Sequence, residues 1–250
     1  MPGLHRSIAV FAVFLLTTAL MPVHAAVPAS ITTAGCEEQE FSLEYPSAPF
    51  KKLLPPGFKL STLDPTGLLA FVDISVDHCN SVDGGAGSED LTAFVEVVPP
   101  AQYQQANLTA YGLLLAIWST RAQTVDTFTA WGFGKQAAAG LVAFKNGLNL
   151  LGRKIGTVTV QSGASKISAL TFFAAQKSTY AAGGTRGFAQ DASGALHILD
   201  ANWTEQTFQG GLATFTQSGP GPLPLRLPAQ IYPALAGHAT NYALTLHSVQ

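Results

Sequence analysis

The chain has 250 residues, of which 47% are hydrophobic and 11% are charged, and its formal net charge is −2. This composition fits one compact domain rather than two. The small acidic net charge argues against a nucleic-acid partner and against an anionic membrane partner.

Residues 1–25 are predicted to be a secretory signal. A short basic segment with His5 and Arg6 precedes an apolar segment over residues 8–20, and Ala25 ends a small-residue cleavage site. No later stretch approaches the roughly 18 consecutive apolar residues of a membrane-spanning helix. The sequence therefore predicts an exported protein, extracellular or periplasmic, with no membrane contact after signal removal.

The two cysteines, Cys36 and Cys79, both lie in the exported part of the chain. In an oxidising compartment they are expected to form one disulfide bond, and their spacing gives no reason to expect a metal site. Asn107 and Asn202 each begin an Asn-X-Thr triplet, which is a glycosylation acceptor if the host is eukaryotic.

The first structural signals follow a short arm. Residues 26–40 are small and polar without a period, and we interpret them as an N-terminal arm. Residues 41–45 alternate apolar and polar side chains, which predicts a half-buried strand. One helical turn over residues 50–54 is then expected before a turn at residues 55–57, where two prolines precede a glycine. The folded domain is predicted to span residues 41–250.

Further strands are predicted where β-branched and aromatic residues cluster between turn-forming residues. They cover residues 68–76, 91–98, 113–118, 157–161, 167–176, 196–202, 212–217 and 241–247. Residues 137–151 are predicted to be helical from propensity, although they include two glycines. The pair Gly183 and Gly184 is interpreted as a plain turn. Many short strands and few helices indicate a mainly β, β-dominated α+β fold, either a barrel or a sandwich.

Residues 127–136 form an aromatic, glycine-rich stretch with one lysine, Lys135. Because Lys135 follows Trp131 and Phe133, we expect its ammonium group to be partly buried, which would lower its pKa. A neutral amine can attack a carbonyl carbon to give an imine. The alternative is a lysine at a strand end, whose stem covers apolar surface while its head reaches water.

Two acidic residues are candidates for the same site. Asp73 lies inside an apolar strand, and Glu89 precedes another. A carboxylate in an apolar wall is costly unless it is paired or used. The alternatives are an outward-facing strand position for Asp73 and a solvated loop for Glu89. The histidines are scattered, and the common hydrolase signatures are absent.

Read in order, these motifs resemble the acetoacetate decarboxylase family. The resemblance is carried by residues 53–58 (LLPPGF), 71–74, 88–89, 133–136 (FGKQ) and 235–246. It implies a β-barrel around an apolar cavity, in which Lys135 would form a Schiff base with a β-keto acid without a cofactor. By the same resemblance, Glu89 and Asp73 would be catalytic, and Trp131, Phe133 and Gln136 would contact the substrate.

Three features depart from that family's pattern. Gln136 stands where the family has a second lysine, Gly134 stands where it has a proline, and residues 37–40 contain no arginine. Two hypotheses follow. The protein is either an exported lyase that forms an imine with a β-keto acid or another small carbonyl compound, or a non-catalytic exported member of the fold that binds a small apolar ligand. The sequence leaves open whether the chain forms a homo-oligomer.

Overall fold

The computed structural model of the protein describes residues 27–61, 66–148, 154–219 and 232–249. Its helical segments are α1 (Ala48–Lys51), η1 (Ala101–Tyr103), α2 (Ala122–Phe128) and the π-helical turn η2 (Thr129–Phe133). The strands of this part of the chain are β1 (Ser30–Pro46), β2 (Lys59–Leu60), β3 (Leu69–Val82), β4 (Ser88–Val98), β5 (Ala110–Ser119), β6 (Ala137–Ala139), β7 (Leu141–Leu148), β8 (Lys154–Ser162), β9 (Ser165–Phe173), β10 (Ser178–Tyr180), β11 (Gly183–Gln190), β12 (Leu196–Trp203), β13 (Gln206–Ser218) and β14 (Tyr232–Val249).

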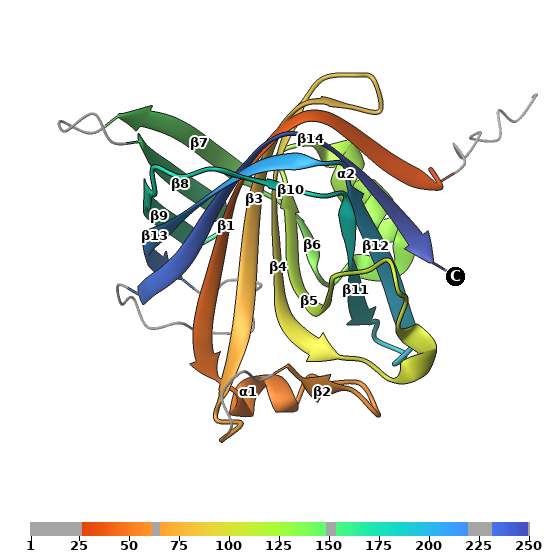
Figure 1. Ribbon diagram of the computed structural model, residues 1–250. Coiled ribbons are helices and arrows are strands. Elements are labelled where there is room, and N and C mark those ends of the chain that lie inside the picture. The colour runs from red at the N-terminus through yellow and green to blue at the C-terminus, as the bar shows by residue number, and fades with distance from the viewer. Residues whose placement is uncertain (1–26, 62–65, 149–153, 220–231, 250) are drawn as a thin grey trace, which may run out of the picture.

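Seven strands close into a barrel in the order β1-β3-β4-β5-β11-β12-β14, and β14 pairs with β1 to complete the ring. All the pairings in this ring are antiparallel except that of β5 with β11. A second group of strands, β13-β9-β8-β7, continues from the first half of β14 and leans away from the barrel (Figure 1). The predicted mainly β barrel is confirmed.

Alternation along the strands sends side chains to two opposite faces. On one face, apolar residues of β1, β3, β4 and β5 pack against the second group of strands and form the larger core. Its fully buried members include Phe41 and Ile74 from the barrel and Ile167 and Phe215 from β9 and β13. Burying a side chain of this size contributes roughly 1.5–3 kcal/mol each.

The opposite face of the same strands points into the barrel. One apolar cluster on this face takes residues from all seven barrel strands, which is only consistent with the interior of the ring. The residues that the seven barrel strands contribute to this cluster are Ile31, Val82, Phe94, Leu114, Ile117, Ala189, Leu199 and Leu246. We call the space that this face encloses the lumen.

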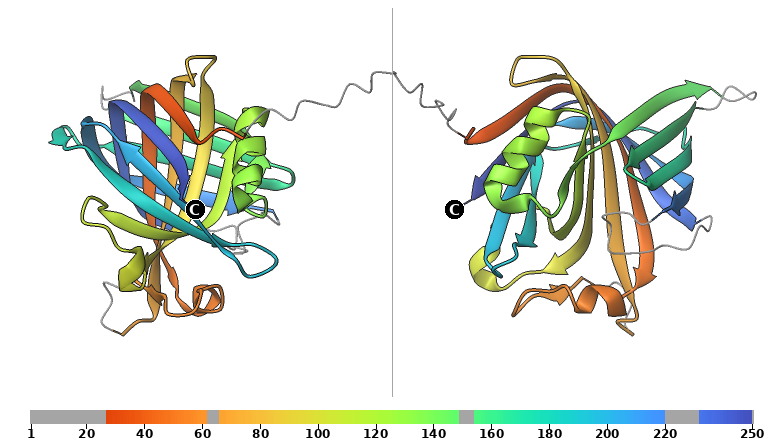
Figure 2. Two further views of the ribbon diagram at one scale, coloured as in Figure 1. Left: turned by 90° about the vertical axis from the view of Figure 1, so that its right-hand side faces the viewer. Right: turned by 180° about the vertical axis from the view of Figure 1, so that it is seen from behind.

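The α2 and η2 segment lies against one end of the barrel (Figure 2). Phe128, Trp131 and Phe133 from this segment pack into the apolar cluster of the lumen. The rings of Phe128 and Trp131 meet edge to face with centroids 5.5 Å apart, a favoured aromatic geometry. The segment therefore closes this end of the lumen with aromatic side chains.

Three predictions about local structure are wrong. Residues 30–40 are not an arm, because β1 runs without interruption from Ser30 to Pro46 and pairs with both β3 and β14. The helix predicted over residues 137–151 is absent over 137–148, which form β6 and β7 paired with β5 and β8. Gly183 and Gly184 are not a plain turn but the start of β11. In each case pairing with distant strands overrides the local preference.

Candidate functional site

Lys135 is exposed, so the prediction that it is partly buried is wrong. It lies in the turn over residues 134–136, between η2 and β6. Gly132 adopts φ +96°, and a Cβ atom there would lie 2.2 Å from the His197 ring. This glycine conformation breaks the helical path: Trp131 and Phe133 turn into the lumen, and the lysine comes to lie at the surface. Imine formation by Lys135 stays a prediction. The buried environment that was expected to lower the pKa of the lysine is not present around it.

The three residues predicted to contact the substrate beside Lys135 are more buried than the lysine itself. Phe133 is fully buried in the lumen cluster, and Trp131 is 8% exposed there, with its Nε1 donating to the Pro28 carbonyl at 2.8 Å. Gln136 is half-buried, and its Oε1 has no hydrogen-bond partner among the described residues. Trp131 and Phe133 therefore face the lumen, whereas Lys135 lies at the surface.

Asp73 and Glu89 lie on opposite faces of the barrel wall. Asp73 is 4% exposed and points into the lumen, where the Ser42 hydroxyl donates to its Oδ1 at 2.5 Å. Glu89 is half-buried on the other face, with its Oε1 3.2 Å from His78 Nδ1. The structure therefore does not bring together the predicted set Lys135, Glu89 and Asp73. The inward position of Asp73 excludes the outward-facing alternative.

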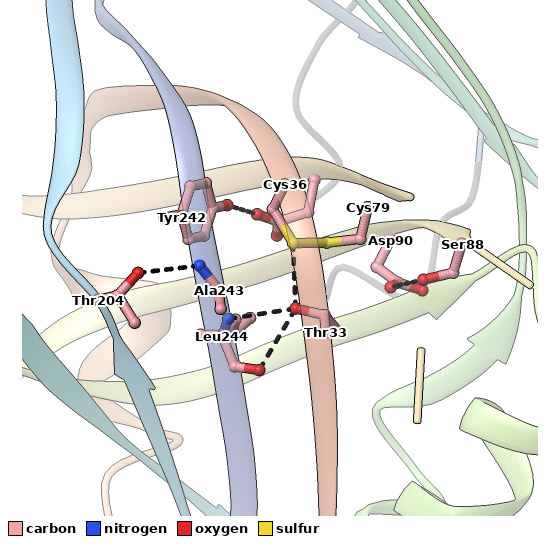
Figure 3. The surroundings of a disulfide bond; sticks show 10 residues. Thr33, Cys36, Cys79, Ser88, Asp90, Thr204, Tyr242, Ala243 and Leu244 are labelled. Atoms are coloured by element: carbon pink, nitrogen blue, oxygen red, sulfur yellow. Dashed lines mark hydrogen bonds between the residues drawn. A yellow bond between two sulfur atoms is a disulfide. The ribbon is translucent and has the colours of Figure 1, made fainter. Parts of the chain in front are cut away.

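The predicted disulfide between Cys36 and Cys79 is present and joins β1 to β3 (Figure 3). Both cysteines are 1% exposed. The Thr33 hydroxyl lies 3.0 Å from Cys36 Sγ.

The two glycosylation triplets differ in exposure. Asn107 lies in an exposed turn, whereas Asn202 is half-buried within β12.

Sequence reasoning missed a group of carboxyl side chains that gathers in the lumen beside Asp73. We call this group the carboxyl wall, and it consists of Glu38, Glu40, Asp73, Asp77, Asp90 and Glu96. Its members come from β1, β3 and β4, where Glu38 pairs with Asp77 across the strands. Tyr242 hydrogen-bonds to Asp77, and the Ser88 hydroxyl donates to Asp90 Oδ2 at 2.6 Å (Figure 3).

Burial raises the pKa values of the wall members on β1 and β3 and of Asp90 on β4. Desolvation raises the pKa of Glu38 and of Asp73 to about 8 and that of Glu40 and of Asp77 to about 7. For Glu38 and Glu40 the second cause is repulsion, since Asp77 raises the pKa of Glu38, and Glu38 raises that of Glu40. For Asp73 and Asp77 the second cause is a hydrogen bond that lowers the pKa, donated by Ser42 and by Tyr242. Like charges in a shared low-dielectric space cannot all ionise together. Near neutral pH the wall therefore holds several protons.

No lysine or arginine is among the groups that shift the pKa values of Glu38, Glu40, Asp73 and Asp77. Arg186 is buried, but it pairs with Asp200, with Nε and one terminal nitrogen each 2.6 Å from a carboxylate oxygen. Its side chain also donates to the Tyr103 carbonyl at 2.9 Å. Arg121 interacts with Asp90 at one end of the wall. In the described part of the chain, the centre of the wall therefore has no cation beside it.

Part of the carboxyl wall keeps contact with solvent. Glu38, Glu40, Ser75, Phe94 and Glu96 all point inward and are nonetheless half-exposed, so solvent reaches them inside the ring. The wall adjoins the apolar cluster of the lumen at Phe94, which lies on β4 two residues from Glu96. Gly112 leaves room for this ring, because a Cβ atom there would lie 2.3 Å from it. The lumen thus has an acidic side and an apolar side, whereas the sequence predicted only an apolar cavity.

An alternation signal could have identified the wall. Glu38, Glu40 and Ser42 alternate with Gln39 and Phe41, and Asp73 to Asp77 repeat the pattern with Ile74 and Val76 between the polar residues. Such a pattern places all the acidic side chains of the run on one face of the strand. It does not reveal whether that face turns outward to solvent or inward to a barrel.

No protein-family model and no curated sequence matches the chain. Solved structures do match. Acetoacetate decarboxylase from Legionella pneumophila is 13% identical, with 98% of each chain covered and a TM-score of 0.59. An acetoacetate decarboxylase-like enzyme from Sphingomonas wittichii RW1 is 11% identical, with 90% of this chain and 94% of that chain covered and a TM-score of 0.60. The enduracididine biosynthesis enzyme MppR, with HEPES bound, is 12% identical, with 90% and 88% covered and a TM-score of 0.55.

These likenesses show that the protein has a divergent acetoacetate decarboxylase-like fold, as the order of its motifs predicted. Two kinds of feature are absent from the described residues. Among the described residues, no group of three or more His, Cys, Asp or Glu side chains is arranged to hold a metal ion. No helix in the described ranges is long and apolar enough to cross a membrane.

Proposed function

We propose that this protein, which has the fold of acetoacetate decarboxylase, uses its barrel lumen to bind a small organic cation with an apolar body. The observation that carries the proposal is the pairing of the carboxyl wall with the apolar cluster inside one ring. An ammonium group would lie against Glu38, Asp73 and Asp77, and its hydrocarbon part would contact Phe94, Leu114 and Trp131. On binding, the carboxyl groups of the wall would release protons, and the positive charge of the ligand would take the place of those protons.

The electrostatics favour this ligand class over an anion. A cation about 4 Å from a carboxylate gains roughly 4 kcal/mol at the effective dielectric of a protein surface, and more at a drier site. A β-keto acid would bring a negative charge to a wall where burial and neighbouring carboxyl groups already oppose ionisation. Binding of a cation should lower the pKa values of Glu38 and Asp77, and protons should be released on binding near pH 7.

This proposal takes up the second of the two hypotheses, a non-catalytic member of the fold, and changes the ligand from apolar to cationic. The lyase hypothesis has less support, because Lys135 is exposed and, among the described residues, no lysine shifts the pKa values of the four carboxyl groups at the centre of the wall. The one buried arginine of these residues, Arg186, is held by Asp200. A ligand in the lumen would therefore meet carboxyl groups and hydrocarbon rather than an amine.

Isothermal titration with hexylammonium and hexanoate tests the proposal, since the two probes share a chain length and differ in charge. We expect hexylammonium to bind and hexanoate not to bind. Replacing Glu38 by Gln together with Asp77 by Asn should weaken hexylammonium at least tenfold, while the exposed Glu44→Gln on the same strand should leave it unchanged. Equal binding of hexanoate, or binding that survives the double substitution, would reject the proposal. Turnover of acetoacetate that is lost in Lys135→Ala would establish the lyase instead.

We also propose that the protein is exported after removal of residues 1–25. The disulfide between Cys36 and Cys79 supports this, because such bonds persist in oxidising compartments. When the full sequence is expressed in a secreting host, mass spectrometry of the secreted protein should find a chain that starts at Ala26. Retention in the cytosol with Met1 still attached would contradict export, whatever the lumen binds.

A further inference from the structure

A second pocket lies on the face of the barrel wall opposite the lumen. It has a volume of about 420 Å³. Glu37, His78 and Glu89 are paired in register across β1, β3 and β4, and Phe144 and Asn146 reach them from β7. The full lining is Gly35, Cys36, Glu37, His78, Asn80, Glu89, Phe144, Asn146 and Asn241.

The two carboxylates of this pocket are held by neighbouring groups. Glu89 Oε1 lies 3.2 Å from His78 Nδ1, and the His78 ring lies over Phe144 with centroids 6.2 Å apart and planes inclined by 22°. Asn146 donates to Glu37 Oε2 at 2.9 Å. The pocket differs from the carboxyl wall in its composition, since a histidine and an asparagine lie beside its two acids.

A buried network fixes Glu37 and Asn146 from behind. His238 is 2% exposed, and its Nε2 lies 3.4 Å from Asn146 and 3.7 Å from Glu37 Oε2. Lys154 Nζ lies 2.9 Å from His238 Nδ1 and 5.4 Å from the centre of the Phe173 ring. Burial lowers the pKa of His238 to about 4. The imidazole is therefore neutral, so Nδ1 can accept from Lys154 while Nε2–H points towards the Glu37 carboxylate. Such supporting contacts hold binding side chains in one orientation.

Two further carboxamides line the pocket without a hydrogen bond to any other described residue. Asn80 lies on β3, and Asn241 occupies a bulge of β14 with φ +62°. A bulge in β1 at Gly35, also with φ +62°, lies beside it. Bulges re-aim side chains and are frequent beside functional sites. The Cys36–Cys79 disulfide ties β1 to β3 at this point (Figure 3).

From this arrangement we propose that the pocket binds a neutral polyhydroxylated ligand, namely a saccharide unit. Each carboxamide offers both donors and acceptors, which vicinal hydroxyl groups require, and the free groups of Asn80 and Asn241 would pair with them. Phe144, the one aromatic carbon ring of the lining, would contact the C–H face of the sugar ring. The carboxylates are already paired, so they favour accepting hydroxyl hydrogens over capturing a cation. The proposal is independent of the ligand in the lumen.

Saturation-transfer NMR with methyl β-glucoside, methyl α-mannoside and N-acetylglucosamine at millimolar concentration tests the saccharide site. We expect ring protons of at least one of these sugars to be saturated. Asn80→Ala and Asn241→Gly each remove a carboxamide that makes no hydrogen bond in the described structure, and Gly accepts the positive φ, so both variants should fold. Together they should weaken binding at least tenfold.

The matched control is Asn107→Ala, which changes an exposed asparagine in a turn of the η1–β5 loop, outside the pocket lining, and should leave sugar binding unchanged. The double substitution in the carboxyl wall should also leave it unchanged, which separates this site from the lumen. Absence of saturation transfer with all three sugars would overturn the proposal. So would a signal that survives loss of both carboxamides while the melting temperature shows a folded protein.

Discussion

Raising the pH from 6.5 to 8.5 is expected to lower the melting temperature of the protein by about 8 °C, which corresponds to on the order of 3 kcal/mol in a chain of this size. The cause is the carboxyl wall. Folding raises the pKa of Glu38 and of Asp73 to about 8 and that of Glu40 and of Asp77 to about 7. The magnitude is taken at about half of the nominal value, because Glu38 and Glu40 keep contact with solvent.

The sign follows from proton binding in the two states. At pH 6.5 the unfolded chain has released the protons of these carboxyl groups, whereas the folded chain still holds several of them. Stability therefore falls as the pH rises through the folded pKa values of about 7 and 8. His238 acts in the opposite direction, but its folded pKa of about 4 and its ordinary value of 6.5 place its effect below this window.

Substitutions identify the groups responsible. Glu38→Gln with Asp77→Asn removes two charges of the wall while keeping their shape, so the loss of melting temperature between pH 6.5 and 8.5 should shrink by about half. Glu44→Gln changes an exposed glutamate on the same strand, β1, and should reproduce the wild-type loss. Scanning calorimetry at the two pH values measures both. A wild-type protein that melts at the same temperature or higher at pH 8.5 would contradict the pKa values assigned to the wall.

Replacing both Cys36 and Cys79 by alanine is expected to destabilise the protein by about 4 kcal/mol, or roughly 12 °C in melting temperature. The bond joins residues 43 positions apart and therefore restricts a long loop of the unfolded chain. It also ties β1 to β3 where β1 bulges at Gly35, the place at which the register of the barrel changes. Urea unfolding of the oxidised protein and of the double variant measures the difference.

Reduction provides the internal control for this effect. A reductant should destabilise the wild-type protein and leave the double variant unchanged, since the variant has no cysteine. The double substitution also avoids a free buried thiol, because each cysteine is 1% exposed. A variant within about 1 kcal/mol of the oxidised wild type would show that the loop is already restricted in the unfolded chain.

Much of the fold could be predicted because its signals are local. Alternation marked residues 41–45 within β1, and clusters of β-branched and aromatic residues marked the centres of β3, β4 and β5. Residues 137–148 could not be assigned correctly, because alanine favours helix and the partners that make them strands lie in β5 and β8. The exposure of Lys135 depended on the conformation of Gly132, which residue type permits but does not require.

By itself, the sequence determined a mainly β chain, the two cysteines that one disulfide requires, and the alternation of polar and apolar residues along β1 and β3. Only the tertiary structure decided that Glu38, Asp73 and Asp77 share the inside of a ring while Lys135 lies outside it. The physical reason is that alternation fixes which side chains share a face, whereas closure of β14 onto β1 decides which face is enclosed.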